Sequence, residues 1–146
     1  MGTKAEGSLG MRTNTVATAA AVLVGLEGAA VIALAAWQTV AIASGDTAAL
    51  DSAIALLVLT VVGGAAVLAF SFAIWRRLSW GRSGGIVTQV MILAVALGAA
   101  TGAYAEPVTA LILAVPALVT LVLLVIAVRD AGRQARQSSA EDTNLP

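Results

Sequence analysis

The sequence contains no cysteine and no histidine. These absences exclude disulfide bonds, zinc sites built from Cys and His, haem or iron–sulfur ligation by those residues, and nucleophile pairs of the Ser-His or Cys-His type. Charge is also scarce, because only 11% of the 146 residues are charged, against about 25% in a soluble domain. The sequence therefore predicts no catalytic residues, no metal site and no cofactor, and it favours a protein that is not an enzyme.

Apolar surface is what the chain has in excess. Hydrophobic residues make up 60% of the chain and the mean hydropathy is +0.97, whereas a soluble domain is about 45–50% apolar. One small core cannot hide that much apolar surface. We therefore expect the lipid bilayer to be the principal partner. The net charge is zero and no basic patch is present, so no nucleic-acid binding is expected.

Four segments are long and apolar enough to span a bilayer, which takes about 20 mostly apolar residues. Ala and Leu, which favour helices, dominate them. The predicted fold class is an all-α membrane protein with four transmembrane helices in two antiparallel hairpins. The domain is expected to cover residues 15–132, between disordered cytoplasmic segments 1–14 and 133–146. The expected spans are residues 16–43, 53–75, 84–105 and 107–128.

Basic residues predict the orientation of the chain, because Lys and Arg collect on the cytoplasmic side. Every basic residue lies before the first span, between the second and third spans, or after the fourth. Both termini are therefore predicted to be cytoplasmic. The preference for Arg over Lys, with heavy Ala, Val and Gly usage, is typical of a bacterial genome of high GC content, so we expect the bacterial inner membrane. The arginines expected to set topology or to bind lipid headgroups are Arg76, Arg77, Arg82, Arg129, Arg133 and Arg136.

Glu27 is the one charged residue within a predicted span. It lies about 15 Å from the cytoplasmic end of its helix, and insertion of a carboxylate at such depth costs about 2.5–3.5 kcal/mol. We expect it to be protonated, hydrogen-bonded or in contact with water. Depth makes Thr120 and Gln89 candidate partners, and Gln38 shares the helix face of Glu27. The cluster is either a proton- or cation-coupled site or a buried acid that fixes helix packing.

Small residues mark where membrane helices approach one another closely. The third span carries a GxxxG motif at Gly98 and Gly102, and the first span has small residues at four-residue spacing, including Gly25 and Ala29. One interpretation is an interface with a second copy or with another membrane protein. The alternative is packing within this chain, and the motif alone does not separate the two.

The segment from Trp80 to Gln89 resembles small uncharacterised integral membrane proteins of actinobacteria, in which a basic, aromatic turn precedes a helix that begins with a hydroxyl residue and Gln. This resemblance implies four membrane helices and no particular activity. The small multidrug resistance transporters are similar in having four short helices and a Glu in the first. Their pattern around that Glu and their aromatic-rich binding chamber are missing here.

Two functions follow from these patterns. The first is a non-enzymatic structural or accessory membrane protein that assembles with itself or with a larger membrane complex. The second is a small proton- or cation-coupled transporter, or an ion-conducting oligomer, that uses Glu27. The sequence names no substrate and no partner protein for either function.

Overall fold

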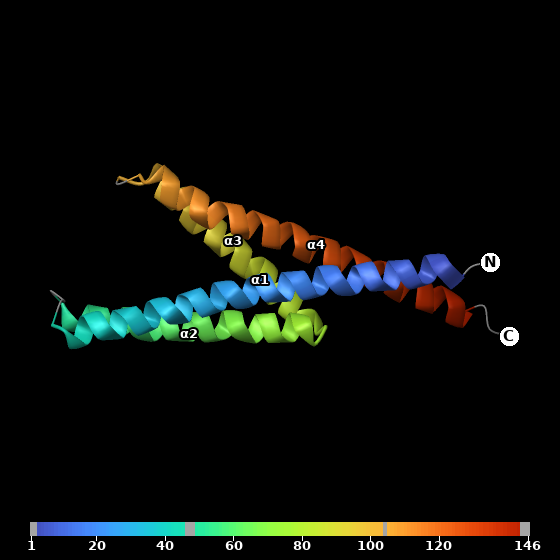
Figure 1. The fold of residues 1–146 in the computed structure, drawn as a ribbon, viewed down its shortest axis with the longest axis horizontal. Coiled ribbons are helices and arrows are strands. Elements are labelled where there is room, and N and C mark those ends of the chain that lie inside the picture. The colour runs from blue at the N-terminus through green and yellow to red at the C-terminus, as the bar shows by residue number, and fades with distance from the viewer. Residues whose placement is uncertain (1–2, 46–48, 104, 144–146) are drawn as a thin grey trace.

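A computed structural model of the chain describes residues 3–45, 49–103 and 105–143, and these residues contain four α-helices and no strand (Figure 1). Each helix is long and apolar enough to cross a membrane, which confirms the predicted all-α class with four candidate membrane spans. The helices are α1 (Thr3–Ala43), α2 (Leu50–Trp75), α3 (Ser79–Thr101) and α4 (Pro107–Thr143).

All four helices differ from the expected spans at one end or both, and α2 begins at Leu50, three residues earlier than expected. The backbone is helical from Thr3 in α1 and as far as Thr143 in α4, so both helices extend beyond the apolar segments. α3 lies earlier in the sequence than expected, from Ser79 to Thr101, because Leu78 already serves as its N-cap. α4 begins at Pro107, as predicted, where proline loses no hydrogen bond. The disorder expected at both ends of the chain stays a prediction.

The helices pack as two antiparallel pairs. Along α1 and α2, Gly25 lies against Ser71, Gly28 against Leu68, and Gly64 of α2 against Ile32, so the two helices run in opposite directions. α3 and α4 form the second pair, and the two pairs meet through α2 with α3 and through α1 with α4. The tight contacts fall at glycines because a missing side chain allows close approach.

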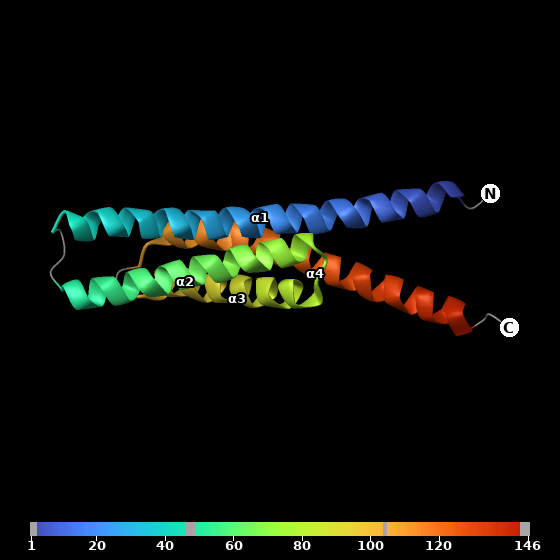
Figure 2. The same ribbon diagram turned by 90° about the horizontal axis from the view of Figure 1, so that it is seen from below.

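The two ends of the molecule are arranged differently. We call the end that holds both termini and the α2–α3 turn the terminal end, and the opposite end the far end. The α3–α4 pair crosses the α1–α2 pair and diverges from it toward the far end (Figures 1 and 2). Contact between the pairs is therefore concentrated in the half of the molecule nearer the terminal end.

The buried core follows from this crossing. It consists of Ala20, Ala21, Val24, Ile74 and Leu124, with Val67, Phe70, Ile86 and Leu123 packed against it. Most large apolar side chains elsewhere are exposed. Only 6% of the residues in an apolar 18-residue stretch of α2 are buried. Such exposure is costly in water but not in lipid, which is as apolar as these side chains.

Two backbone hydrogen bonds close the turn between α2 and α3. The Arg77 N–H donates to the Ile74 carbonyl and the Leu78 N–H donates to the Ala73 carbonyl, both at 2.9 Å. This is the Schellman arrangement that closes a helix C-terminus. Its left-handed position is filled by Arg77, at φ 59°, where glycine is usual. The turn is therefore short, and α3 folds directly back along α2.

Candidate functional site

Glu27 lies where three helices meet. Its Oε2 accepts a hydrogen bond from Nε2 of Gln89 on α3 at 2.5 Å, and its Oε1 accepts one from Oγ1 of Thr120 on α4 at 3.3 Å. The structure thus brings three of the four residues of the expected polar site together. We call Glu27, Gln89 and Thr120 the polar cluster. It joins α1 of one helix pair to both helices of the other.

The helix crossing buries two of the three residues of this cluster. Gln89 and Thr120 are fully buried, each with an exposed fraction of 0%, while Glu27 is half-buried. The two helix pairs touch at this level, just beyond the core residues Val24 and Leu124. A polar side chain in such surroundings is costly unless it is hydrogen-bonded. The two hydrogen bonds supply partners for both oxygens of Glu27.

One atom of the cluster is left without a partner. Oε1 of Gln89 is buried and accepts no hydrogen bond from the described part of the chain. The nitrogen of the same amide is on Glu27, so this unused oxygen lies beside the carboxylate. Buried acceptors are nearly always satisfied in native proteins. The cluster therefore offers an unused oxygen next to an acid.

Gln38, the fourth expected site residue, lies apart from the cluster. It is eleven residues beyond Glu27 on α1, which corresponds to about 16 Å along the helix axis. Its side chain is half-buried and its Oε1 has no hydrogen-bond partner among the described residues. Leu34, which lies seven residues after Glu27 on nearly the same side of α1, is 52% exposed.

The four small residues singled out for helix packing have different surroundings. A side-chain carbon added at Gly25 would lie 2.9 Å from Oγ of Ser71, so Gly25 packs against α2. Ala29 is exposed, and a carbon added at Gly98 would meet nothing within 4 Å. At Gly102 the only close neighbour is Gly98 of the same turn. Among the residues that the structure describes, no other helix packs against the glycines of this GxxxG motif.

Two glycines that the spacing of small residues within the expected spans does not single out, Gly81 and Gly85, also lie close to other helices. A carbon added at Gly81 would lie 2.5 Å from Cβ of Ala73 and 2.7 Å from the backbone nitrogen of Ile74. A carbon at Gly85 would lie 3.1 Å from Leu124 and 3.2 Å from Ile74. The four-residue spacing of these glycines is the signal that predicts such contact. It resembles that of Gly98 and Gly102, so spacing alone does not distinguish them.

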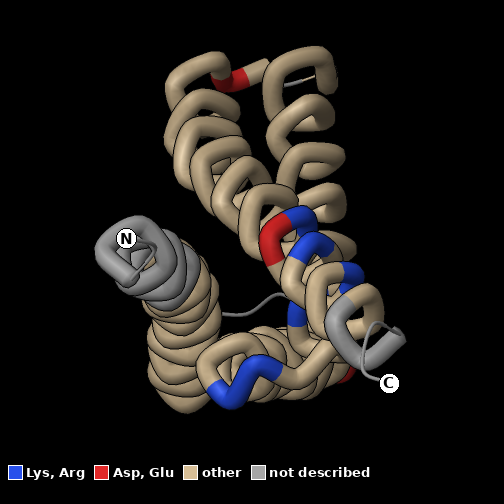
Figure 3. The backbone as a smooth tube through the Cα atoms, turned by 90° about the vertical axis from the view of Figure 1, so that its right-hand side faces the viewer, with Lys and Arg blue, Asp and Glu red and all other residues tan. Residues whose placement is uncertain are grey.

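The described arginines gather at the terminal end (Figure 3). The guanidinium of Arg76 lies over the ring of Phe72, 5.4 Å from its centroid. Arg77 and Arg82 line a small hollow of about 50 Å³ together with Asp130. A larger, open hollow of about 380 Å³ is lined by Arg129, Arg133 and Arg136. These side chains present a basic surface at one end of the helices.

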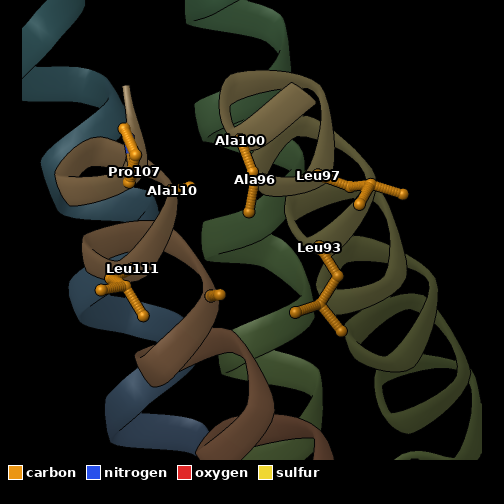
Figure 4. A pocket seen from close by; sticks show the side chains of 8 residues that line it. Leu93, Ala96, Leu97, Ala100, Pro107, Ala110 and Leu111 are labelled. Carbon is orange, nitrogen blue, oxygen red and sulfur yellow. The ribbon is translucent and has the colours of Figure 1, made fainter. Parts of the chain in front are cut away.

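An apolar groove lies between α3 and α4 at the far end (Figure 4). Its volume is about 380 Å³ and its lining offers no polar side chain. The groove can hold an acyl chain or an apolar side chain, but it has no group for acid–base or nucleophilic chemistry. Its lining residues are Leu93, Ala96, Leu97, Ala100, Pro107, Ala110, Leu111 and Ala114.

The polar cluster is therefore the strongest candidate site. Within the part of the chain that the structure describes, no three acidic residues come close enough to hold a metal ion. Comparisons with protein-family models, with curated proteins and with solved structures found no match. By the length and composition of its helices, the chain has the features of a multi-pass membrane protein.

Proposed function

We propose that this protein is a structural or accessory component of the bacterial inner membrane, which is not an enzyme and which assembles with itself or with a larger membrane complex. The single observation that supports this most is the hydrogen bonding of the Glu27 side chain. Both of its oxygens accept hydrogen bonds from the opposite helix pair. An acid placed in this way fixes the packing of membrane helices, which use hydrogen bonds between buried side chains in place of the hydrophobic effect.

The proposed orientation places both termini in the cytoplasm. It rests on the arginines at the terminal end, which the positive-inside rule assigns to the cytoplasmic surface. Glu106, by contrast, lies in the connection at the far end. Reporter fusions test the orientation. A reporter fused after residue 143 should be active only in its cytoplasmic form, and activity of the periplasmic form would reverse the assignment.

The proposed assembly surface is the exposed face of α3. Val87, Met91 and Val95 are 59%, 64% and 62% exposed, and Gly98 continues the same face with open space around it. An exposed apolar face that continues to a glycine suits close approach by another helix in lipid. A second copy of this chain is the simplest partner, because it supplies the same surface.

Chemical crosslinking in native membranes tests this surface. Gly98→Leu should strongly reduce the crosslinked dimer, because the added side chain blocks close approach. The matched control is Gly63→Leu on α2, where the glycine is also in open space. Gly102 is unsuitable, because an added carbon would lie 2.8 Å from the carbonyl oxygen of Gly98 in its own turn. Unchanged crosslinking in Gly98→Leu, or an equal loss in Gly63→Leu, would remove α3 as the assembly surface.

A second candidate function is a small proton- or cation-coupled transporter or an ion-conducting oligomer. The observation that favours it is the unpartnered Oε1 of Gln89 beside Glu27. Flux assays in liposomes separate the two functions. Transport predicts proton or cation flux in the wild type that is lost in Glu27→Gln, with folding retained. The accessory role predicts no flux in either protein and a stable assembly in mild detergent.

A further inference from the structure

Three arginines of α4 share one face of the helix. Arg129, Arg133 and Arg136 are spaced by four and then three residues, which brings their side chains to the same side. All three are exposed, and with Gly132 they line the open hollow of about 380 Å³ at the terminal end. A carbon added at Gly132 would meet nothing within 4 Å, so there is free space beside the arginines. We call this space the arginine hollow.

The arginine hollow lies where the helices leave the apolar part of the bilayer. The apolar segment of α4 ends directly before Arg129, and the rest of α4 extends past the α2–α3 turn (Figure 2). That turn is at the same level, because Arg77 lines the same small hollow as Asp130. Trp75 and Trp80 flank the turn and are 70% and 51% exposed, as is typical of residues at the level of lipid headgroups.

The direction of α4 brings the three guanidinium groups toward this level. α4 runs from the far end to the terminal end, so its N-terminal direction points back into the membrane. Arg133 and Arg136 lie about 6 Å and about 10 Å beyond Arg129 along the helix axis. Side chains on a helix lean toward its N-terminus, and long arginine side chains extend toward the membrane interface. The three arginines therefore converge on a headgroup that lies beside Arg129.

The charge of the arginine hollow is not cancelled by a described acid. Asp130 is the one acidic residue in the segment 129–136, and it lines the smaller hollow with Arg77 and Arg82. No acidic side chain is among the described residues that line the arginine hollow. Guanidinium groups bind phosphate oxygens through paired, charge-assisted hydrogen bonds. A topology signal needs only positive charge on this side of the membrane and does not require a shared hollow.

The same face of α4 is apolar and exposed on the membrane side of the arginine hollow. Leu118, Val122 and Val125 precede Arg129 by eleven, seven and four residues, spacings that return to one side of a helix. Their side chains are 50%, 56% and 37% exposed. A ligand that joins an anionic headgroup to acyl chains therefore matches the whole face, whereas a soluble anion matches the arginines alone.

We propose that the arginine hollow binds the headgroup of an anionic phospholipid. Its phosphate accepts hydrogen bonds from the arginines of the hollow, and its acyl chains lie along the exposed apolar face of α4. This inference requires helices that span a membrane, as proposed above, but it does not depend on the assembly surface of α3. It adds a binding site for a particular class of lipid to the structural or accessory role.

Native mass spectrometry of the purified protein in a mild detergent tests the proposal, because it resolves each bound lipid by its mass. The probes are dioleoyl-phosphatidylglycerol, which is anionic, and dioleoyl-phosphatidylcholine, which is zwitterionic and has the same acyl chains. A basic residue near the membrane surface strengthens binding of an anionic lipid by about fivefold, so three should favour the first phosphatidylglycerol by about a hundredfold. Glycerol 3-phosphate, which has the phosphate but no acyl chain, should bind much more weakly.

Two pairs of variants locate the site. Arg133→Gln should weaken phosphatidylglycerol binding by about fivefold, whereas Arg76→Gln removes the same charge outside the hollow and should leave it unchanged. Gly132→Leu fills the hollow without changing charge and should weaken binding at least as much as Arg133→Gln. Ser138→Leu adds the same side chain on the opposite face of α4 and is its control. All four positions are exposed, and circular dichroism checks that each variant is folded.

Equal affinity of the wild type for the two lipids would overturn the proposal, and this comparison needs no variant. Glycerol 3-phosphate that binds as tightly as phosphatidylglycerol would make the site one for a soluble anion. Equal losses in Arg76→Gln and Arg133→Gln, or unchanged binding in folded Gly132→Leu, would overturn the assignment to the arginine hollow. A protein that selects phosphatidylglycerol but stays monomeric would leave this inference intact and contradict the proposed assembly.

Discussion

The terminal and far ends of this molecule use the same kinds of residue to opposite effect. At the terminal end, Gly81 and Gly85 lie against the backbone and side chains of other helices, and Ile74 and Leu124 are fully buried. At the far end, Gly98 has open space around it and Leu111 is 62% exposed. Along α3 and α4, glycine and leucine therefore contact another helix where the two helix pairs cross, and Gly98 and Leu111 lie outside that contact. The composition of a segment therefore indicates that it lies in lipid, but it does not determine which part of the segment packs against another helix.

The largest expected difference between the two ends is at glycine. Gly81→Ala should lower the free energy of unfolding by about 2–3 kcal/mol, because the added carbon would meet the backbone of Ile74 and force α2 and α3 apart. Gly98→Ala should raise it by up to about 1 kcal/mol, since alanine favours helix and has space here. Thermal unfolding in one detergent measures both variants. Equal effects at the two sites would contradict the difference between the ends.

Leucine truncation gives the next largest effect. Leu124→Ala should lower the free energy of unfolding by about 2 kcal/mol, near the lower limit for buried leucines in soluble proteins, because lipid removes much of the transfer cost. Leu111→Ala should change it by less than about 0.5 kcal/mol, since its side chain is exposed. Unfolding in SDS–detergent mixtures measures the pair. A larger loss at Leu111 would mean that the far end packs against something in the detergent-solubilised protein.

A smaller difference is expected between two threonines of α4. Thr120→Val keeps the shape of the side chain and removes the hydrogen bond to Glu27, which should cost about 0.6–1.7 kcal/mol. Thr109 also donates to an acid, Glu106, at 2.9 Å, but this pair is exposed at the far end, so Thr109→Val should cost less than about 0.5 kcal/mol. The same SDS titration compares them. A neutral Thr120→Val would show that the polar cluster does not stabilise the crossing.

Effects of about 1 kcal/mol or less, with opposite signs, are expected at the turns. Arg77 adopts a left-handed conformation in the α2–α3 turn, and Gly45 adopts one beside the α1–α2 connection, at φ 59° and 74°. Arg77→Gly relieves the backbone strain of the folded protein but gives the unfolded chain more conformational freedom. It should therefore raise the free energy of unfolding by less than about 1 kcal/mol. Gly45→Ala should destabilise by about 1 kcal/mol. The melting temperature should rise in Arg77→Gly and fall in Gly45→Ala. A lower melting temperature in Arg77→Gly would show that the arginine side chain stabilises the fold by more than its left-handed backbone destabilises it.

Part of the polar cluster was predictable from depth along the helices. Glu27 and Thr120 lie at similar distances from the ends of their spans, and Gln89 is close enough to reach the acid, so both were candidate partners before the fold was known. Depth did not separate them from Gln38, which shares the helix face of Glu27 but lies beyond the crossing. The angle between the helix pairs decides this, and no periodicity within one helix encodes it.

The angle between the helix pairs also explains why the two glycine motifs have different surroundings. Gly81 and Gly85 have the spacing of Gly98 and Gly102, and only the first two contact another helix. Gly98 and Gly102 lie inside the expected third span, residues 84–105, whereas Gly81 precedes it, and α3 in fact begins at Ser79. The Schellman turn at Arg77 starts α3 earlier than expected and carries Gly81 onto the last turn of α2.

The sequence by itself determined that four apolar segments form helices long enough to cross a membrane, because hydropathy and helix preference are properties of each segment and need no knowledge of its neighbours. Tertiary structure alone decided where the two helix pairs cross, which glycines are enclosed, and that Gln89 and Thr120 both reach Glu27. Lipid leaves no hydrophobic difference between the faces of a helix, so the choice of inward face depends on close packing and on a few hydrogen bonds between helices.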